Sequence, residues 1–218
     1  MPETVSEQPS TSLDGLADIY GQTAAFYRPI AAQTGNLGFQ ILYGPPFKNP
    51  PILFLGYQPG GGEKDRLVEL KKGSEERWPP VCEYATEKWR LAQHMQNMFG
   101  APLLRQCVGI NAIFMSAPNI EAYKKMSTPD TRRKVQDFCL GKVREVIAAT
   151  MPHRIVAIGF ETLSLFGKSE PDLKNAKGRT LTRIGRVSGI RALAVLHLSG
   201  ARISNDDRRA IADRVLNN

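Results

Sequence analysis

The chain is poor in cysteine, and the three that it has, Cys82, Cys107 and Cys139, lie far apart. An odd number of cysteines at this spacing gives neither a zinc motif nor a disulfide framework, so a reducing cytoplasm is predicted. The sequence also has no run of about 18 apolar residues, so no membrane span is expected. Its first ten residues lack the basic and apolar regions of a secretory signal.

Positive charge is absent from residues 1–27, which contain four acidic residues and no Lys or Arg. The rest of the chain carries 29 basic against 17 acidic side chains, a net charge of +12, compared with +8 for the whole chain. Residues 174–191 contain basic but no acidic side chains: Lys174, Lys177, Arg179, Arg183, Arg186 and Arg191. Such a surface attracts polyanions, and neutralisation of phosphates is its usual use. Charge alone leaves open both a polyanion-binding protein and an ordinary soluble protein of basic pI.

Four short apolar runs predict strands, at residues 52–55, 108–115, 155–158 and 192–196. Their continuous hydrophobicity is typical of parallel strands buried on both faces. Helices are predicted between and around them, at residues 13–32, 84–99, 129–150 and 204–216, with Thr128 and Ser204 as N-caps. This alternation predicts one α/β domain over residues 13–218, a three-layer α/β/α sandwich with a four-stranded parallel sheet. Residues 1–12, rich in Pro, Ser, Thr and Glu, are predicted to be a disordered tail.

In open parallel sheets, ligands bind beyond the carboxyl ends of the strands. The segments there read GYQPGGGE, SAPN, GFET and HLSGARIS. In the first, Gln58 sits in a sharp glycine and proline turn, which is either a ligand site or a plain tight turn or anion-binding loop. In the last, His197 stands at a strand end beside a small basic loop, where it can stabilise a developing anion or play a structural role. His94 and His153 have no such setting and are interpreted as structural.

Together these segments resemble the motifs of the uracil-DNA glycosylase superfamily. The first motif of that family, a strand followed by Gly-x-Asp/Asn-Pro-Tyr/Gly, is similar to GYQPG, and its last, a strand followed by His-Pro-Ser, is similar to HLSGA. Between them, GINAIFMSAPN is similar to the strand that bears a base-reading Asn, and REVIAATMPHRIVAIGFETL to the helix and strand that follow. The resemblance spans roughly residues 45–214. It implies a four-stranded parallel sheet between helices and a DNA glycosylase activity.

The resemblance also implies roles for individual residues. Gln58 takes the place of the residue that positions the attacking water, and His197 would hydrogen-bond the base as negative charge builds on it. Asn111 would read the Watson–Crick edge of the pyrimidine, with Trp78 or Tyr84 as the stacking aromatic ring. Residues of the first motif would line the base: Tyr57, Pro59 and Gly60. Residues of the last loop would bind flanking phosphates or wedge the stack: Ser199, Gly200, Arg202 and Ile203. The basic stretch, including Lys177, Arg179 and Arg183, would bind backbone phosphates or form a solvated charged loop.

Four departures from the family pattern bear on function. Gln58 is neither Asp nor Asn, and its amide cannot take a proton as a general base. Leu198 replaces the usual proline, which changes the loop. Three cysteines cannot hold the iron–sulfur cluster of some members, so no metal or cofactor is implied. Gly60 stands where some members place a Tyr that blocks C5-substituted pyrimidines, so thymine-like or larger C5-modified bases, such as modified cytosine in phage DNA, are candidate substrates besides uracil.

Three functions remain open from the sequence. The first is a monofunctional DNA glycosylase that flips out a pyrimidine and leaves an abasic site, in repair or in antiviral defence against modified phage DNA. The second, motivated by Gln58, is a catalytically weak or inactive nucleic-acid-binding protein on the same fold. The third is a nucleotide- or phosphate-binding α/β enzyme that uses the glycine loop. A cytoplasmic monomer with DNA as its partner is expected.

Overall fold

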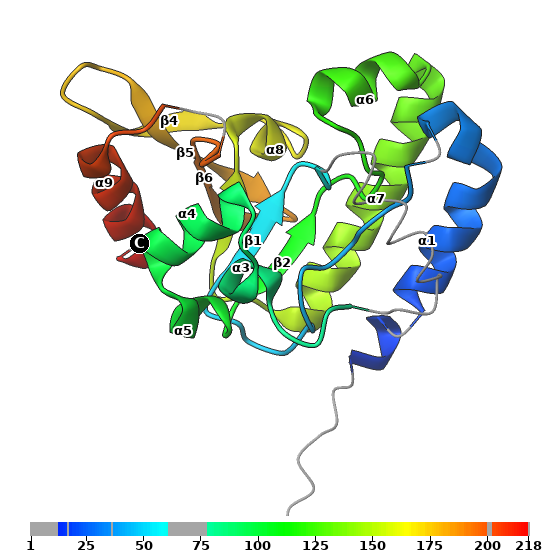
Figure 1. The fold of residues 1–218 in the computed structure, drawn as a ribbon, viewed down its shortest axis with the longest axis horizontal. Helices are drawn as coiled ribbons and strands as arrows, with labels where there is room; N and C mark the ends of the chain where they lie inside the picture. The colour runs from blue at the N-terminus through cyan, green and yellow to red at the C-terminus, as the bar shows by residue number, and fades with distance from the viewer. Residues whose placement is uncertain (1–12, 17, 36, 61–77, 200–201, 218) are drawn as a thin grey trace, which may run out of the picture.

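The computed structural model of the chain describes residues 13–16, 18–35, 37–60, 78–199 and 202–217, so the predicted tail, residues 1–12, lies outside it. These residues form one six-stranded sheet in the order β2-β1-β3-β6-β5-β4 (Figure 1). Its strands are β1 (Leu53–Gly56), β2 (Val108–Asn111), β3 (Ile155–Ile158), β4 (Glu170–Lys174), β5 (Thr180–Val187) and β6 (Ile190–Val195). The first four in spatial order are parallel, and β5 and β4 continue the sheet antiparallel. The α/β class is confirmed, but the sheet has six strands instead of the predicted four.

The four parallel strands arise from the four apolar runs. Every residue of β1, β2 and β3 is buried, because helices cover both faces. The run predicted over residues 108–115 ends as a strand at Asn111. Beyond that point the chain bonds to the turn that follows β1: the Ala112 and Ile113 N–H groups donate to the Gly56 and Tyr57 carbonyls at 2.8 Å each.

The basic stretch, residues 174–191, is not a solvated loop: it runs from the end of β4 through β5 to the start of β6, and β4 and β5 form a hairpin. A two-residue turn, Ser188 and Gly189, joins β5 to β6, and both residues have positive φ, 52° and 80°. Such turns match the twist of paired strands and favour glycine. At the other end of β5, the Asn175 side-chain oxygen accepts from the Lys177 and Arg179 N–H groups at 3.0 Å and closes the turn from β4. The pairing of β4 with β5 shifts register near Pro171 and Leu173.

Helices cover both faces of the sheet (Figure 1). On one face lie η1 (Leu13–Leu16), α1 (Ile19–Tyr27) and α7 (Pro129–Thr150). On the other lie α3 (Glu83–Thr86), α4 (Arg90–Phe99), α5 (Ala101–Leu104) and α9 (Asn205–Leu216). Short helices complete the described chain: η2 (Arg28–Thr34), α6 (Ile120–Met126) and α8 (Phe160–Ser164).

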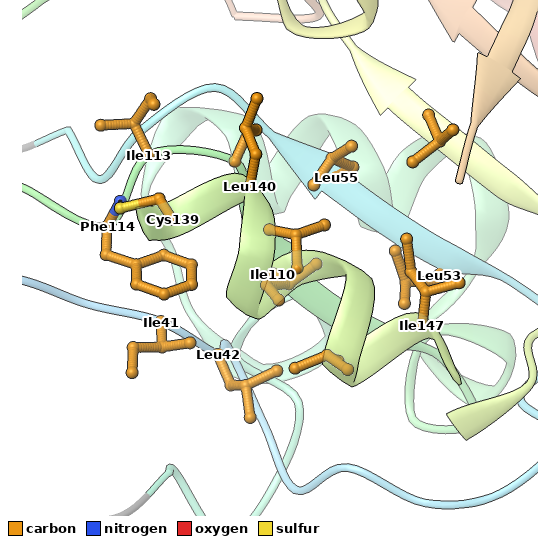
Figure 2. Packing of buried hydrophobic residues seen from close by; sticks show 14 of the residues in the cluster. Ile41, Leu42, Leu53, Leu55, Ile110, Ile113, Phe114, Cys139, Leu140 and Ile147 are labelled. Carbon is orange, nitrogen blue, oxygen red and sulfur yellow. The ribbon is translucent and has the colours of Figure 1, made fainter. Parts of the chain in front are cut away.

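Alternate residues of each parallel strand face the two helical layers, as the two-residue period of a strand requires. Figure 2 shows Leu53, Leu55 and Ile110 directed toward Cys139, Leu140 and Ile147 of α7. Their strand neighbours, such as Phe54, pack into the opposite core with α4 and α9. The sheet therefore has a separate apolar core on each face, packed against the helices of that side.

The two helices for which an N-cap residue was predicted, α7 and α9, have nearly the predicted bounds. The two helices predicted without a cap are broken into shorter pieces. Helix α7 has the predicted bounds, and the Thr128 hydroxyl accepts from the Thr131 N–H at 3.2 Å. Ser204 caps α9 in the same way, accepting from Asp207 N–H at 3.1 Å. The helix predicted over residues 13–32 is broken into η1, α1 and η2, and that over residues 84–99 into α3 and α4. None of the described helices has both the length and the apolar character needed to cross a membrane.

An extended segment, residues 38–43, covers the outer edge of β2. It runs antiparallel to that edge through bridges from Leu42 to Ile110 and from Phe39 to Met115. The Asn111 N–H donates to the Ile41 carbonyl at 3.0 Å within this pairing. The segment closes one of the two edges of the sheet.

Candidate active site

The carboxyl ends of the four parallel strands meet at one edge of the sheet. Gln58 follows β1 and His197 follows β6, with β3 between these two strands. Neighbouring strands lie about 4.8 Å apart, so the ends of β1 and β6 are roughly 10 Å apart. Asn111 ends β2, one strand further out. The segments that carry Gln58 and His197 therefore lie on either side of the end of β3.

Gln58 is held in a fixed orientation with one free acceptor. Its Nε2 donates to the Ala117 carbonyl at 3.3 Å, so the amide nitrogen and oxygen cannot be exchanged without losing that bond. Its Oε1 is buried and has no hydrogen-bond partner among the described residues. A buried acceptor without a partner costs about 1–3 kcal/mol, so a donor from a water or a ligand is favoured there.

The rest of the first turn supports Gln58. Pro59 is buried, and its carbonyl accepts from the Ala117 N–H at 3.2 Å, which joins this turn to the segment after β2. Tyr57 is half-buried, and burial raises the pKa of its hydroxyl. Gly60 is exposed, and a Cβ added there would meet no heavy atom within 4 Å. The turn is thus anchored at Pro59 and open at Gly60.

His197 stands over the turn that ends β3. A Cβ placed on Gly159 would lie 3.5 Å from His197 Cδ2, an ordinary contact distance, so the ring lies directly beside this turn. The Gly159 φ of +94° favours glycine at this position. The Ser199 hydroxyl lies 3.2 Å from Nδ1. The residue keeps an exposed face, yet the surrounding protein removes enough water from the ring to lower its pKa below 6.5, against an opposing effect of Glu161. This lowered pKa favours the neutral form of the ring.

The loop after His197 is anchored by apolar side chains. Leu198, which replaces the family's proline, is buried in the core shared with α9, and so is Ile203. Ile203 therefore does not fit the predicted role of a wedge in the base stack, since core packing holds it. Arg202 is exposed, and Gly200 lies outside the described residues.

Asn111 does not present its amide to a ligand. The residue is 0% exposed. Its Oδ1 accepts from the Tyr43 hydroxyl and its Nδ2 donates to the Gln40 carbonyl, each at 3.2 Å. Both ends of the amide thus bond to the segment that covers β2. This geometry does not fit the predicted reading of a pyrimidine edge and gives Asn111 a structural role.

The two aromatic candidates belong to the cores. Trp78 packs edge-on against Tyr20 of α1, with ring centroids 6.3 Å apart. Tyr84 is fully buried, with the rings of Tyr43 and Trp89 at 4.8 and 5.5 Å. Neither ring is placed to stack on a base at the carboxyl edge.

The basic residues of the hairpin divide into two groups. Lys177 and Arg179 are exposed, and the Arg179 guanidinium donates to the Arg202 carbonyl, which links the hairpin turn to the loop after His197. Arg183 is half-buried, donates to the Ser169 hydroxyl at 2.9 Å and lies 5.8 Å from the centre of the Phe160 ring. Of the three residues predicted to bind phosphates, Lys177 and Arg179 are therefore exposed enough to do so, and Arg183 has a structural role.

Two residues of the third strand end were not predicted as site residues. Phe160 and Glu161 follow Gly159 directly and open α8, between the segments that carry Gln58 and His197. The Glu161 carboxylate is exposed and has no ion pair or hydrogen bond within the described chain. Ligands bind beyond the carboxyl ends of parallel strands, and this rule applied to GFET as much as to the other strand ends. Glu161 could therefore have been predicted as a site residue from the sequence.

The described residues contain no group of three or more His, Cys, Asp or Glu side chains that could hold a metal ion. The fold and this edge define a mixed α/β protein with a candidate site at the carboxyl ends of its parallel strands. No protein-family model matches the chain, and no curated protein matches it either.

Proposed function

We propose that the protein is a DNA glycosylase of the uracil-DNA glycosylase type, which flips out a pyrimidine and hydrolyses its N-glycosidic bond. The observation that carries the proposal is the position of Gln58 and His197 on either side of β3, with the buried Gln58 Oε1 lacking a partner among the described residues. Four neighbouring parallel strands between two helical layers also agree with the fold that the sequence resemblance implies. That the fold is specifically that of the uracil-DNA glycosylases is part of the proposal.

His197 would stabilise the departing base. If the Ser199 hydroxyl donates to Nδ1, the ring hydrogen resides on Nε2, next to the Cδ2 edge that faces Gly159. A neutral imidazole in this state donates to the base oxygen on which negative charge builds. Donors fixed in advance for a developing anion contribute more than any other single effect in many enzymes.

Gln58 would orient the water. Its Oε1 can accept one hydrogen of a water molecule, whose oxygen then attacks C1′ of the deoxyribose. The C1′–N bond breaks, the electron pair leaves with the base, and the proton released by the water ends on the base. The product is an abasic site and a free pyrimidine.

The DNA would be held by the loop after His197 and by the hairpin. Ser199, Gly200 and Arg202 would bind the phosphates nearest the flipped nucleotide, and Lys177 and Arg179 the backbone beyond. The link from Arg179 to the Arg202 carbonyl supports this arrangement, because it holds the two basic segments side by side. Affinity should then fall steeply with salt concentration.

The substrate would be uracil or a C5-modified pyrimidine. Gly60 is exposed, and no atom of the described residues lies within 4 Å of where its side chain would begin, which supports an open C5 side. A panel of oligonucleotides that differ only in the C5 group tests this point. Cleavage of plain uracil alone would remove the modified bases from the proposal, and with them a role in defence against phage DNA.

The decisive experiment replaces His197. His197→Ala should reduce the single-turnover rate of base release about 100- to 1,000-fold, the range found when one such donor is lost. Release is measured as alkali-sensitive strand breaks in a labelled duplex, and DNA affinity should stay near that of the wild type. His153→Ala, on an exposed residue at the opposite end of β3, is the matched control. Equal rates in both variants would assign the cleavage to another site or a contaminant.

A second candidate is a nucleic-acid-binding protein without catalysis. It is favoured by the amide of Gln58, which cannot accept a proton as a general base, and by the buried Asn111, which leaves no base-reading amide at the edge. Salt-dependent DNA binding without release of any base, from any oligonucleotide in the panel, would select this candidate.

A further inference from the structure

The turn that follows β3 is fixed to the strands on both sides of it. The Gly159 N–H donates to the Val195 carbonyl at the end of β6, at 2.9 Å. The hydroxyl of the buried Thr162 donates to the Ile158 carbonyl at 2.8 Å. These bonds hold Phe160 and Glu161, which lie between them in sequence, in one position at the carboxyl edge.

Glu161 lies beside both flanking segments of the candidate site. The His197 ring lies against the turn that contains Glu161, since a Cβ placed on Gly159 would contact His197 Cδ2. Its negative charge raises the pKa of His197, which follows β6, and also that of Tyr57, the residue before Gln58 after β1. The Glu161 carboxylate therefore affects the pKa of residues in both segments that flank its turn.

The Glu161 carboxylate is also uncommitted. Two surface glutamates form ion pairs, Glu121 with Lys124 at 3.3 Å and Glu145 with Lys142 at 2.8 Å. Glu161 has no such partner in the described part of the chain, although the protein is rich in cations. The carboxylate lies in the first turn of α8 and is free to accept a proton.

We infer that Glu161 is the general base of the hydrolysis, supplying from the third strand end the carboxylate that the first strand end lacks at Gln58. The inference rests on the proposed function. Glu161 takes one proton from the water that Gln58 orients, and the water oxygen bonds to C1′. The C1′–N bond breaks with its electron pair going to the base, which His197 stabilises as an anion. The proton on Glu161 then passes to the base through solvent, which restores the carboxylate.

The test compares Glu161→Gln with Glu121→Gln. Both variants remove one exposed carboxylate near the same edge and keep the shape of the side chain. Loss of a general base typically costs about 10²- to 10⁴-fold, so we expect the single-turnover rate of base release to fall at least about 100-fold in Glu161→Gln, with unchanged DNA affinity. Glu121→Gln should keep the wild-type rate. Glu161→Asp, which retains a carboxylate, should have an intermediate rate.

An NMR titration gives a readout that does not depend on catalysis. The chain has three histidines, so the His197 resonance can be assigned with single variants. Removing the negative charge in Glu161→Gln should lower the pKa of His197, because Glu161 now raises it. An unchanged His197 titration would contradict the placement of Glu161 beside the ring.

The outcomes separate the inference from the function on which it rests. Base release by the wild type and by Glu161→Gln at equal rates overturns the role of Glu161 and leaves the glycosylase in place. A rate loss matched by an equal loss of DNA affinity also overturns it, because Glu161 would then act in binding. No release by the wild type from any substrate overturns both.

Discussion

The two parts of the sheet are held together in different ways. In the parallel part, β1, β2 and β3 are buried along their whole length between two apolar cores. In the antiparallel part, β4 has no buried residue, and polar contacts fix it: Asp172 bonds to Thr182 of β5 and to Arg214 of α9. Strand β6 belongs to both parts. The difference suggests that apolar burial supplies stability, while polar bonds set where the hairpin and its charges lie.

The largest effect is expected in the parallel part. Phe54 is 1% exposed and packs against the rings of Phe99 and Tyr84 at 5.4 and 6.3 Å. Phe54→Ala should lower the free energy of unfolding by about 3–5 kcal/mol, through lost burial and the cavity that remains. Urea denaturation measures the change. A loss below about 1 kcal/mol would mean that the core around β1 is not what stabilises the sheet.

A smaller effect is expected in the antiparallel part. The Asp172 carboxylate accepts from Arg214 Nε at 2.7 Å and from a second guanidinium nitrogen at 2.8 Å, and its side chain is 13% exposed. Asp172→Asn should cost about 2 kcal/mol at pH 7, as expected for charge-assisted bonds that are mostly shielded from water. Hydrogen exchange should rise in β4 and β5 more than in β1. Arg133→Gln, which breaks an exposed pair, should change stability by only a few tenths of a kcal/mol, about the usual value for surface pairs.

The effect of Asp172→Asn should depend on pH. The hydrogen bond from Arg214 lowers the pKa of Asp172 below 3.8 in the folded state. A carboxyl with a lowered pKa stabilises the fold above its unfolded value and loses that contribution as pH falls through the folded value. The stability difference between wild type and variant should therefore be constant near neutral pH and shrink in acid below pH 3.8. A difference that stays the same in acid would show that the charge on Asp172 is not responsible.

The smallest effect is expected from removing one positive charge at the turn between β4 and β5. Lys177→Gln should reduce the slope of DNA affinity against salt concentration by about one unit, as expected when one phosphate contact is lost. Stability should not change, because Lys177 is exposed at a turn. Arg144→Gln is the control, since Arg144 lines a hollow with Met151 and Ser188 at the opposite edge of the sheet. Equal changes in the two slopes would mean that binding depends on total charge and not on the hairpin.

The sequence predicted those elements whose environment leaves a local signature. Burial on both faces produced the continuous apolar runs of the parallel strands, and capping residues set the ends of α7 and α9. Strand β5 was missed because the charges of residues 174–191 suggested a loop, although Ser188 and Gly189 between apolar residues signal a hairpin from β5 to β6. Strand β4 was missed because it has no apolar run. The segment over residues 38–43 was missed because its pairing partners lie about 70 positions later in the chain.

For the candidate site, sequence could place residues at strand ends but not orient their side chains. Asn111 lies on β2 as expected, although the strand ends there instead of at residue 115. Its amide bonds to Gln40 and Tyr43, which are distant in sequence. Ile203 is in a basic loop, yet contacts with α9 bury it. Such directions follow from tertiary packing, which no local pattern records.

The outermost strand affects how separate molecules of this protein meet. An uncovered strand invites another chain to add to it, which leads to aggregation. Here Pro171 has no N–H to offer a newcomer, the irregular pairing around it bends the strand, and Glu170 and Lys174 place opposite charges at its two ends. Residues 38–43 cover the other border of the sheet, so both borders carry features that oppose strand addition.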